Sequence, residues 1–278
     1  MNWKQLALQN RKATIGFVIL VLFILVAILA PWIAPASPTS MEFQPWLRPS
    51  KAHLLGTTAM GQDIFSQLIW GSRLSLLVGF SVGLMTTFLS LVMGLTAGYF
   101  GGIVDGILSA ITNVFLVIPG LPLMIIIAAY MTIRGVFPII VVISVTGWAW
   151  GARVLRSQVL TLKNRDFVLA SRVAGEGPLR IIFSDILPNM LSLIMANFFG
   201  SCLYAILSEA GLEFLGLGDV NVVTWGTMLY WAQNNMALMF GQWPWIVAPG
   251  ICIVLVGTAF ALINFGADEV TNPKLRRR

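Results

Sequence analysis

Long apolar runs separated by short polar segments dominate the chain. A membrane-spanning helix needs about 20 apolar residues, because each residue rises ~1.5 Å and the hydrocarbon layer is ~30 Å thick. Six runs fit this pattern, although the fourth is short and glycine and proline punctuate the third; they cover residues 14–34, 74–98, 110–131, 136–152, 187–207 and 244–266. The pattern predicts an all-α integral membrane protein with six transmembrane helices.

The composition supports this interpretation. The chain has 278 residues, of which 58% are hydrophobic and 10% charged, whereas a soluble domain carries about 25% charged residues. So few charges do not cover a surface that faces water, and a membrane is the expected solvent. The first apolar run is longer than the core of a signal peptide, which has about 7–15 residues. We therefore interpret it as a retained helix.

The distribution of Lys and Arg predicts the orientation. With both termini in the cytoplasm, thirteen basic residues fall on cytoplasmic segments and four on external ones, as the positive-inside rule requires. Topology thus explains the net charge of +6, which gives no reason to expect nucleic acid as a partner. The cytoplasmic set is Lys4, Arg11, Lys12, Arg153, Arg156, Lys163, Arg165, Arg172, Arg180, Lys274, Arg276, Arg277 and Arg278, and the external set is Arg48, Lys51, Arg73 and Arg134.

The six runs contain no Asp, Glu, Lys, Arg or His. Ion-coupled carriers keep ionisable residues within the membrane, and membrane enzymes need acids, bases or metal ligands close together. The lone His53 has no Cys or His at ligand spacing, so we expect no metal site. Because the acids and bases that an enzyme needs are missing from the runs, we expect no catalytic residues. A G-x-x-x-x-G-K-[ST] phosphate loop is missing too, so we expect no bound cofactor. If the chain moves a solute uphill, the energy must come from another polypeptide.

A charged segment interrupts the apolar pattern between the fourth and fifth runs. Read as a helix, residues 158–175 place small side chains on one stripe, with Phe167 and Val168 one turn earlier; the stripe consists of Ala170, Ser171, Ala174 and Gly175. Such a stripe lets another element approach the backbone closely. We expect Gly175 to end this helix in a left-handed cap, Gly177 to form a tight turn and Pro178 to open a second helix.

The predicted helix–turn–helix allows two interpretations. It is either a docking site for another protein or an amphipathic segment on anionic lipid, with Lys163, Arg165, Arg172 and Arg180 at the headgroups. Physical grounds alone favour the two equally. The acidic residues of the segment argue mildly against a pure lipid face; they are Asp166, Glu176 and Asp185.

On the external side, Asp63 is a predicted N-cap. We expect the helix that follows it to lie on the outer membrane face, ahead of Gly71 and the second span. Aromatic residues of the last external segment are predicted to form an interfacial belt, with contact to a docked solute-binding protein, or the entrance of a pathway, as the alternative; they are Trp225, Trp231, Trp243 and Trp245.

Four ordered blocks resemble a known family. Ala170-Ser171-x-x-x-Gly175, followed by Ile186-Leu187-Pro188-Asn189, is similar to the EAA loop of the membrane subunits of binding-protein-dependent ABC importers. The stretches "HLLGTTAMGQDIFSQLIWGSRLSLLVG" (53–79), "GYFGGIVD" (98–105) and "EAGLEFLGLG" (209–218) resemble the C-type permease of peptide/nickel importers, as does the ending at residues 272–275. Leu169 stands where the broad motif has Glu, and Thr58, Gln62, Gln67, Trp70 and Glu213 depart from the family pattern.

The resemblance implies a type I ABC importer permease fold with a cytoplasmic coupling helix, in a prokaryotic cell membrane. It also implies a division into an N-terminal part, 1–73, and a five-helix permease domain, 74–278, which contains the EAA loop at 153–188. Residues implied to couple to the ATPase are Asp166, Phe167, Ala170, Ser171, Arg172, Gly175, Gly177, Pro178 and Arg180. The external family block comprises His53, Gly56, Thr57, Gly61, Asp63, Ser66, Gly71 and Arg73.

The implied partners are a homologous B-type permease subunit, two cytoplasmic ABC ATPase subunits that hold ATP and Mg²⁺, an extracytoplasmic solute-binding protein and membrane lipid. The implied substrate is a small peptide, with an oligosaccharide or a nickel chelate as alternatives. A stand-alone channel or facilitator is the alternative from another class, but it leaves the cytoplasmic segment without a task. A membrane enzyme is disfavoured because no acid–base constellation occurs.

Overall fold

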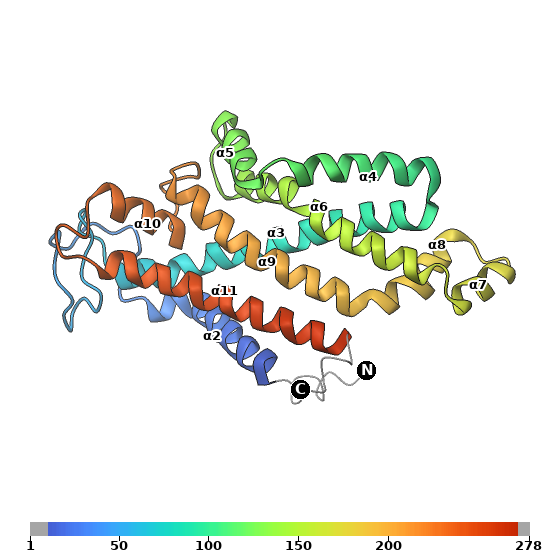
Figure 1. The fold of residues 1–278 in the computed structure, drawn as a ribbon. Helices are drawn as coiled ribbons and strands as arrows, with labels where there is room; N and C mark the ends of the chain where they lie inside the picture. The colour runs from blue at the N-terminus through green and yellow to red at the C-terminus, as the bar shows by residue number, and fades with distance from the viewer. Residues whose placement is uncertain (1–10, 272–278) are drawn as a thin grey trace.

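A computed structural model of the chain describes residues 11–271, with side chains to residue 266. Lys4, Lys274, Arg276, Arg277, Arg278 and the family-like ending at 272–275 lie outside the described residues. The described chain is helical, and five helices are long and apolar enough to cross a membrane (Figure 1): α2 (Arg11–Ile33), α3 (Ile64–Phe100), α6 (Val136–Leu162), α9 (Leu191–Phe214, with the helical turns that precede it) and α11 (Pro244–Thr271). The predicted all-α membrane architecture is confirmed.

Shorter elements complete the fold. Two of them, α4 (Gly102–Val117) and α5 (Gly120–Tyr130), form a bent pair that would make a sixth span. Between α6 and α9 lie α7 (Asp166–Val173), α8 (Pro178–Arg180), the π-helical η1 (Ile181–Ile186) and the 3₁₀-helical η2 (Leu187–Met190), while α10 (Trp225–Asn234) precedes α11.

Helix α3 is the centre of the bundle. It packs along α6 and α9, and α11 lies between α9 and α2. Glycines make the α3–α6 contact close: a Cβ on Gly94 would lie 2.8 Å from the Ala152 carbonyl oxygen, and one on Gly98 would lie 2.7 Å from Val159 Cβ. Small residues at helix contacts are how membrane bundles gain packing energy without a hydrophobic driving force.

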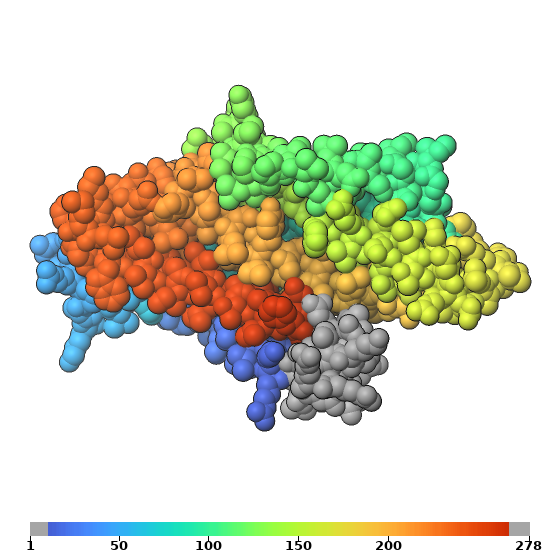
Figure 2. Space-filling view, in the orientation of Figure 1, coloured from blue at the N-terminus to red at the C-terminus, as the bar shows by residue number. Residues whose placement is uncertain are grey.

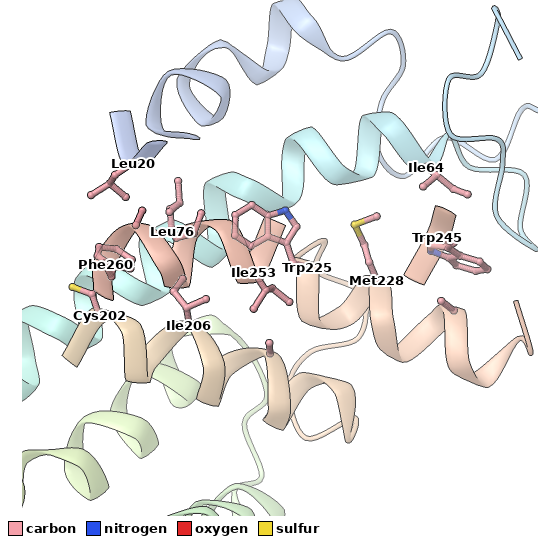
Figure 3. Close-up of a cluster of buried hydrophobic side chains, with 14 of the residues drawn as sticks. Leu20, Ile64, Leu76, Cys202, Ile206, Trp225, Met228, Trp245, Ile253 and Phe260 are labelled. Carbon is pink, nitrogen blue, oxygen red and sulfur yellow. The ribbon is translucent and has the colours of Figure 1, made fainter. Parts of the chain in front are cut away.

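The largest core cluster joins α2, α3, α9, α10 and α11. Figure 3 shows Phe260 of α11 and Ile206 of α9 near Leu76 of α3, with Trp225 of α10 in the middle of the cluster; all four side chains are buried. The Trp225 ring also meets Phe23 of α2 edge to face, at 5.7 Å between centroids. Helix α10, which is predicted to be external, therefore shares one core with the long apolar helices.

The third predicted span, which glycine and proline punctuate, is a bent pair of helices. The chain bends by 89° between α4 and α5, at Ile118 and Pro119, both in extended conformation. Proline disfavours helical conformation in the residue before it and removes a backbone donor, which explains the break. Near the other end of α4, Arg156 of α6 holds Asp105 through two hydrogen bonds of 2.5 and 2.6 Å.

The outer helix predicted after Asp63 is likewise not separate. Asp63 caps it as predicted, because its Oδ2 accepts the Ser66 N–H at 2.8 Å. The helix then continues through Gly71 to Phe100 as α3. At ~1.5 Å per residue it is about 55 Å long and exceeds the hydrocarbon thickness. The boundary expected at 73/74 falls inside α3, and the division there stays a prediction.

The helices are also longer than the apolar runs, and they therefore carry ionisable residues. Helix α9 extends to Phe214 and includes Glu209 and Glu213, both buried. Helix α3 includes Arg73, and α6 includes Arg153 and Arg156. The uncharged character of the six runs does not extend to the helices that contain them, because helical structure continues past the point where hydropathy falls.

Figures 1 and 2 show an elongated molecule with two different ends. We call the end that carries α7 and α8 the hairpin end, and the end that carries residues 34–63 and α10 the loop end. Helix α2 begins, and α11 finishes, on the side of the hairpin end. Of the described basic residues predicted to be cytoplasmic, Arg11 and Lys12 lie at the start of α2, Arg153 and Arg156 lie in the second half of α6, and the other four lie between residues 163 and 180. The hairpin end is thus the predicted cytoplasmic end.

Candidate functional site

The predicted coupling segment forms a protruding hairpin, which we define as residues 163–186. Helix α6 stops at Leu162, and residues 163–165 reverse the chain before α7 begins at Asp166. The single helix expected over 158–175 is therefore wrong, and two helices take its place. Asp166 in the first turn of α7 and Arg172 in its last turn match the helix dipole.

One side chain anchors α7 to the bundle. Val168 is 0% exposed and joins a cluster with Leu155 and Leu162 of α6 and Ile181 and Ile186 of η1. Burial of a valine side chain stabilises its element by about 1.5–3 kcal/mol. Sequence reasoning grouped Val168 with Phe167 as apolar contacts, but Phe167 points outward and is exposed. Val168 is buried and Phe167 is not because η1 packs against the side of α7 that carries Val168.

The turn after α7 has the predicted left-handed cap. Gly175 has φ of +80°, its N–H donates to the Arg172 carbonyl at 3.0 Å, and the Glu176 N–H donates to the Ser171 carbonyl at 3.1 Å. These two bonds define a Schellman motif. Gly177 is extended and forms the N-cap of α8, so the tight turn expected there is wrong. Pro178 opens α8 as predicted.

The outer face of the hairpin lacks contacts within the chain. Val173 is 89% exposed and Leu179 68%, and a Cβ added at Gly175 or Gly177 would meet nothing within 4 Å. Asp166 and Ala170 are exposed on the same short helix, and Ser171 is half-buried. Sequence reasoning missed Val173 and Leu179, although two aliphatic residues flanking a glycine turn were a usable signal.

Three charged side chains near the hairpin turn, Arg172, Glu176 and Arg180, have contacts within the chain. Arg180 pairs with Glu176 four residues earlier, an arrangement that supports helical structure. The Arg172 guanidinium lies 5.4 Å from the centre of the Tyr99 ring of α3. These contacts fix the orientation of the hairpin and leave its apolar tip exposed.

A cavity of about 570 Å³ opens between the α4–α5 bend, α6, α9 and α11. The described residues that line it are uncharged, and its polar members are Thr146, Asn197, Ser201, Tyr204 and Asn264. Glycines of α6 make room for two of them: a Cβ on Gly147 would lie 2.9 Å from the Tyr204 ring, and one on Gly151 would collide with Asn197. The cavity therefore offers neutral hydrogen-bonding groups on an apolar wall.

Two buried carboxyl groups lie at the C-terminal end of α9. Glu209 is 0% exposed and accepts a bond from Ser75 Oγ of α3 at 3.2 Å, while Glu213 accepts a bond from Thr224 Oγ1, the N-cap of α10. Ser75 Oγ in turn accepts the Trp225 N–H at 3.2 Å. This network joins α3, α9 and α10. The i, i+4 spacing of the two glutamates was visible in the sequence, but their burial was not.

The external family block is largely brought together around Asp63. His53 Nδ1 lies 2.9 Å from Asp63 Oδ1, and Ser66 Oγ donates to Asp63 Oδ2 at 2.8 Å. Thr57 Oγ1 donates to the Gln44 carbonyl at 2.7 Å and accepts the Leu47 N–H at 2.9 Å. These bonds fold the segment after α2 onto the start of α3.

The remaining members of the block have separate positions. Gly56 and Gly61 have positive φ, and a Cβ on either would collide with a backbone carbonyl, that of Leu47 or Phe43. Gly71 faces Trp225 of α10, where a Cβ would lie 3.2 Å from the ring. Arg73 lies apart from the Asp63 cluster, exposed on the side of α3. In residues 11–271 no group of three or more His, Cys, Asp or Glu is placed to hold a metal ion.

Comparison with known proteins identifies the class. Residues 90–277 match the family described as binding-protein-dependent transport system inner membrane component, and residues 3–51 match the N-terminal transmembrane domain of oligopeptide transport permease C. The chain belongs to the first of these families, and it is a multi-pass component of the bacterial inner membrane. The expected family and location are thus confirmed.

Individual proteins of known name are similar to nearly the whole chain. The chain is 34% identical to the oligopeptide transport system permease protein OppC of Bacillus subtilis over 99% of its own length and 90% of that protein. It is 35% identical to the dipeptide transport system permease protein DppC of Haemophilus influenzae, over 97% and 92%. Its fold resembles a chain of the MetNI methionine ABC transporter in an inward-facing conformation, with a TM-score of 0.58 and 20% identity over 76% of this chain and 97% of that one.

Proposed function

We propose that the chain is a permease subunit of an ATP-driven importer of small peptides and forms half of its translocation pore. A homologous B-type subunit supplies the other half, and an extracytoplasmic solute-binding protein delivers the substrate. Two separate ABC ATPase subunits bind ATP and Mg²⁺. The support for peptides is that relatives similar over nearly the whole chain are named as oligopeptide and dipeptide permeases.

The hairpin carries the coupling part of this proposal. It is fixed to the bundle through Val168, and it presents Val173 and Leu179 together with two glycines that have open space around them. An ATPase cleft that closed on this tip would bury apolar area and approach the backbone at the glycines. Because Val168 packs against α6 and η1, a displacement of the hairpin would move both spans that flank it.

The proposed pore includes the cavity between α6 and α9. Peptides present amides of fixed polarity but side chains of every charge. A wall of uncharged hydrogen-bonding groups, such as Asn197 and Asn264, suits the backbone of any short peptide and selects no side-chain charge. This property also lets a solute leave easily, as conduction requires.

The decisive experiment compares Val173→Lys with Leu54→Lys in the full chain expressed with its transport partners. Both positions are exposed aliphatics, one at each end of the molecule, and a cation in the last turn of α7 suits the helix dipole. We expect Val173→Lys to lower ATPase co-purification and uptake of labelled dipeptide at least about tenfold, since about 1.4 kcal/mol of lost docking energy has that effect. Leu54→Lys should keep the ATPase bound.

Two results would contradict separate parts of the proposal. Undiminished ATPase binding and dipeptide uptake by Val173→Lys would remove the hairpin from the coupling interface. Uptake of an oligosaccharide or a nickel chelate by the unmodified system, with no uptake of dipeptide or oligopeptide, would overturn the substrate class and leave the coupling intact.

A further inference from the structure

Arg73 is a basic residue whose charge the described chain does not neutralise. It is exposed on the outer part of α3, and no described carboxylate lies within ion-pair distance of it. Asn221 borders the same hollow as Arg73, and the acidic residue close to it in sequence, Asp219, accepts hydrogen bonds from Asn221. The Arg73 guanidinium rests 4.9 Å from the centre of the Trp70 ring, which orients the cation along α3 without cancelling its charge.

Two hollows meet at Arg73. One, of about 410 Å³, is bordered by Thr39, Trp70 and Asn221, and the other, of about 450 Å³, by Ile24, Ile28 and Phe80. Arg73 and Leu77 line both. The first hollow thus reaches the segments that leave the membrane at the loop end, while the second runs between the apolar faces of α2 and α3.

Arg73, where the two hollows meet, lies at a depth that suits contact with a lipid headgroup. Ile28 is five residues before the end of α2, so the wall that faces Arg73 begins about 8 Å below the outer end of that helix. A long basic side chain at such a depth extends toward the interface while its stem stays in the apolar layer. Polar groups above the cation and apolar groups below it follow the order of a phospholipid.

We propose that the groove between α2 and α3 binds an anionic phospholipid of the outer leaflet. Its phosphate contacts Arg73 beneath Trp70 and Thr39, and one acyl chain lies along Ile24, Ile28 and Phe80. Charge complementarity favours this occupant, because the groove provides one cation and an apolar floor. The lipid would add a contact between α2 and the rest of the bundle, and α2 as a whole buries few residues within the chain.

The test uses the full-length chain, purified as its transport complex and equilibrated with an equal mixture of phosphatidylglycerol and phosphatidylcholine. Native mass spectrometry measures which lipid stays bound. We expect one phosphatidylglycerol to be retained about tenfold more strongly than phosphatidylcholine, as for a charge-assisted contact, and Arg73→Gln to remove this preference. Lys51→Gln, which removes another external cation, should leave it unchanged.

A second variant distinguishes a lipid from a soluble phosphate. Leu77→Trp fills the shared wall and should lower retention of either lipid by one copy, whereas a site for phosphate alone would not respond. Equal phosphatidylglycerol retention by the unmodified chain and Arg73→Gln would overturn the proposal. So would a photo-crosslinker attached to Arg73→Cys that reacts with the second permease subunit in place of lipid, because a protein would then cover the groove.

Discussion

The two ends of the molecule are built in opposite ways. At the loop end, the chain provides partners for its own polar groups: Asp63 gathers His53, Ser66 and the start of α3, and Thr57 bonds to the segment at 44–47. At the hairpin end, one buried residue, Val168, anchors a short helix whose tip is exposed. The polar groups around Asp63 are thus satisfied within the chain, whereas the hairpin end is suited to be completed by another molecule.

Glycines make the contrast measurable. Gly61 and Gly175 have almost the same φ angle, +73° and +80°. Their surroundings differ: a Cβ on Gly61 would collide with the Phe43 carbonyl, whereas a Cβ on Gly175 would meet nothing within 4 Å. A positive φ therefore serves close packing at the loop end and a free turn at the hairpin end.

The largest effect is expected from an alanine at Gly61. The left-handed conformation costs about 1–2 kcal/mol for a residue with a Cβ, and overpacking adds about 1–3 kcal/mol. Gly61→Ala should lower the free energy of unfolding by about 3 kcal/mol, and Gly175→Ala by about 1 kcal/mol, because only the conformational part applies there. Thermal unfolding of both purified variants in one detergent measures the difference; equal losses would contradict the contrast.

A bulky residue at Gly175 tests whether the free turn at the hairpin end is needed for function. Because the strain lies in the turn alone, Gly175→Leu should still insert into the membrane while ATPase association and transport are lost. A variant that transported normally would show that the turn has no part in docking.

A smaller effect is expected at the buried carboxyl groups, which tie α10 to α9. Glu213→Ala leaves Thr224 Oγ1 without its acceptor in a buried site, and losing one partner of such a bond costs about 1–3 kcal/mol. Glu213→Gln keeps a side-chain oxygen and should cost less than half as much. Thermal unfolding separates the two, and protease accessibility of residues 216–243 reports whether α10 is released. Equal stability of the two variants would mean that the bond to Thr224 contributes nothing.

These contrasts also explain which features of the structure could be predicted from the sequence. Gly175, Pro178 and Asp63 were assigned correctly because caps and first turns depend on neighbours within a few residues. The break at Ile118 and Pro119 had a local signal too, but a continuous apolar run masked it. Burial at Val168 depends on η1, and burial of Glu209 and Glu213 depends on Ser75 and Thr224, which are far away in sequence. Local chemistry predicted turns, and tertiary contacts decided which side chains were covered.

The smallest structural change tests which end faces the cytoplasm. Gly177 is extended, with φ of −73°, and a Cβ added to it would meet nothing within 4 Å, so Gly177→Cys should leave stability unchanged within about 0.5 kcal/mol. A membrane-impermeant maleimide should label it in inverted vesicles and not in intact cells. Leu54→Cys at the loop end is the matched control with the reverse pattern. Of the two native cysteines, Cys202 is buried and Cys252 is half-buried, so the chain without either substitution gives the background labelling. Labelling of Gly177→Cys from outside the cell would reverse the topology and separate the hairpin from any cytoplasmic ATPase.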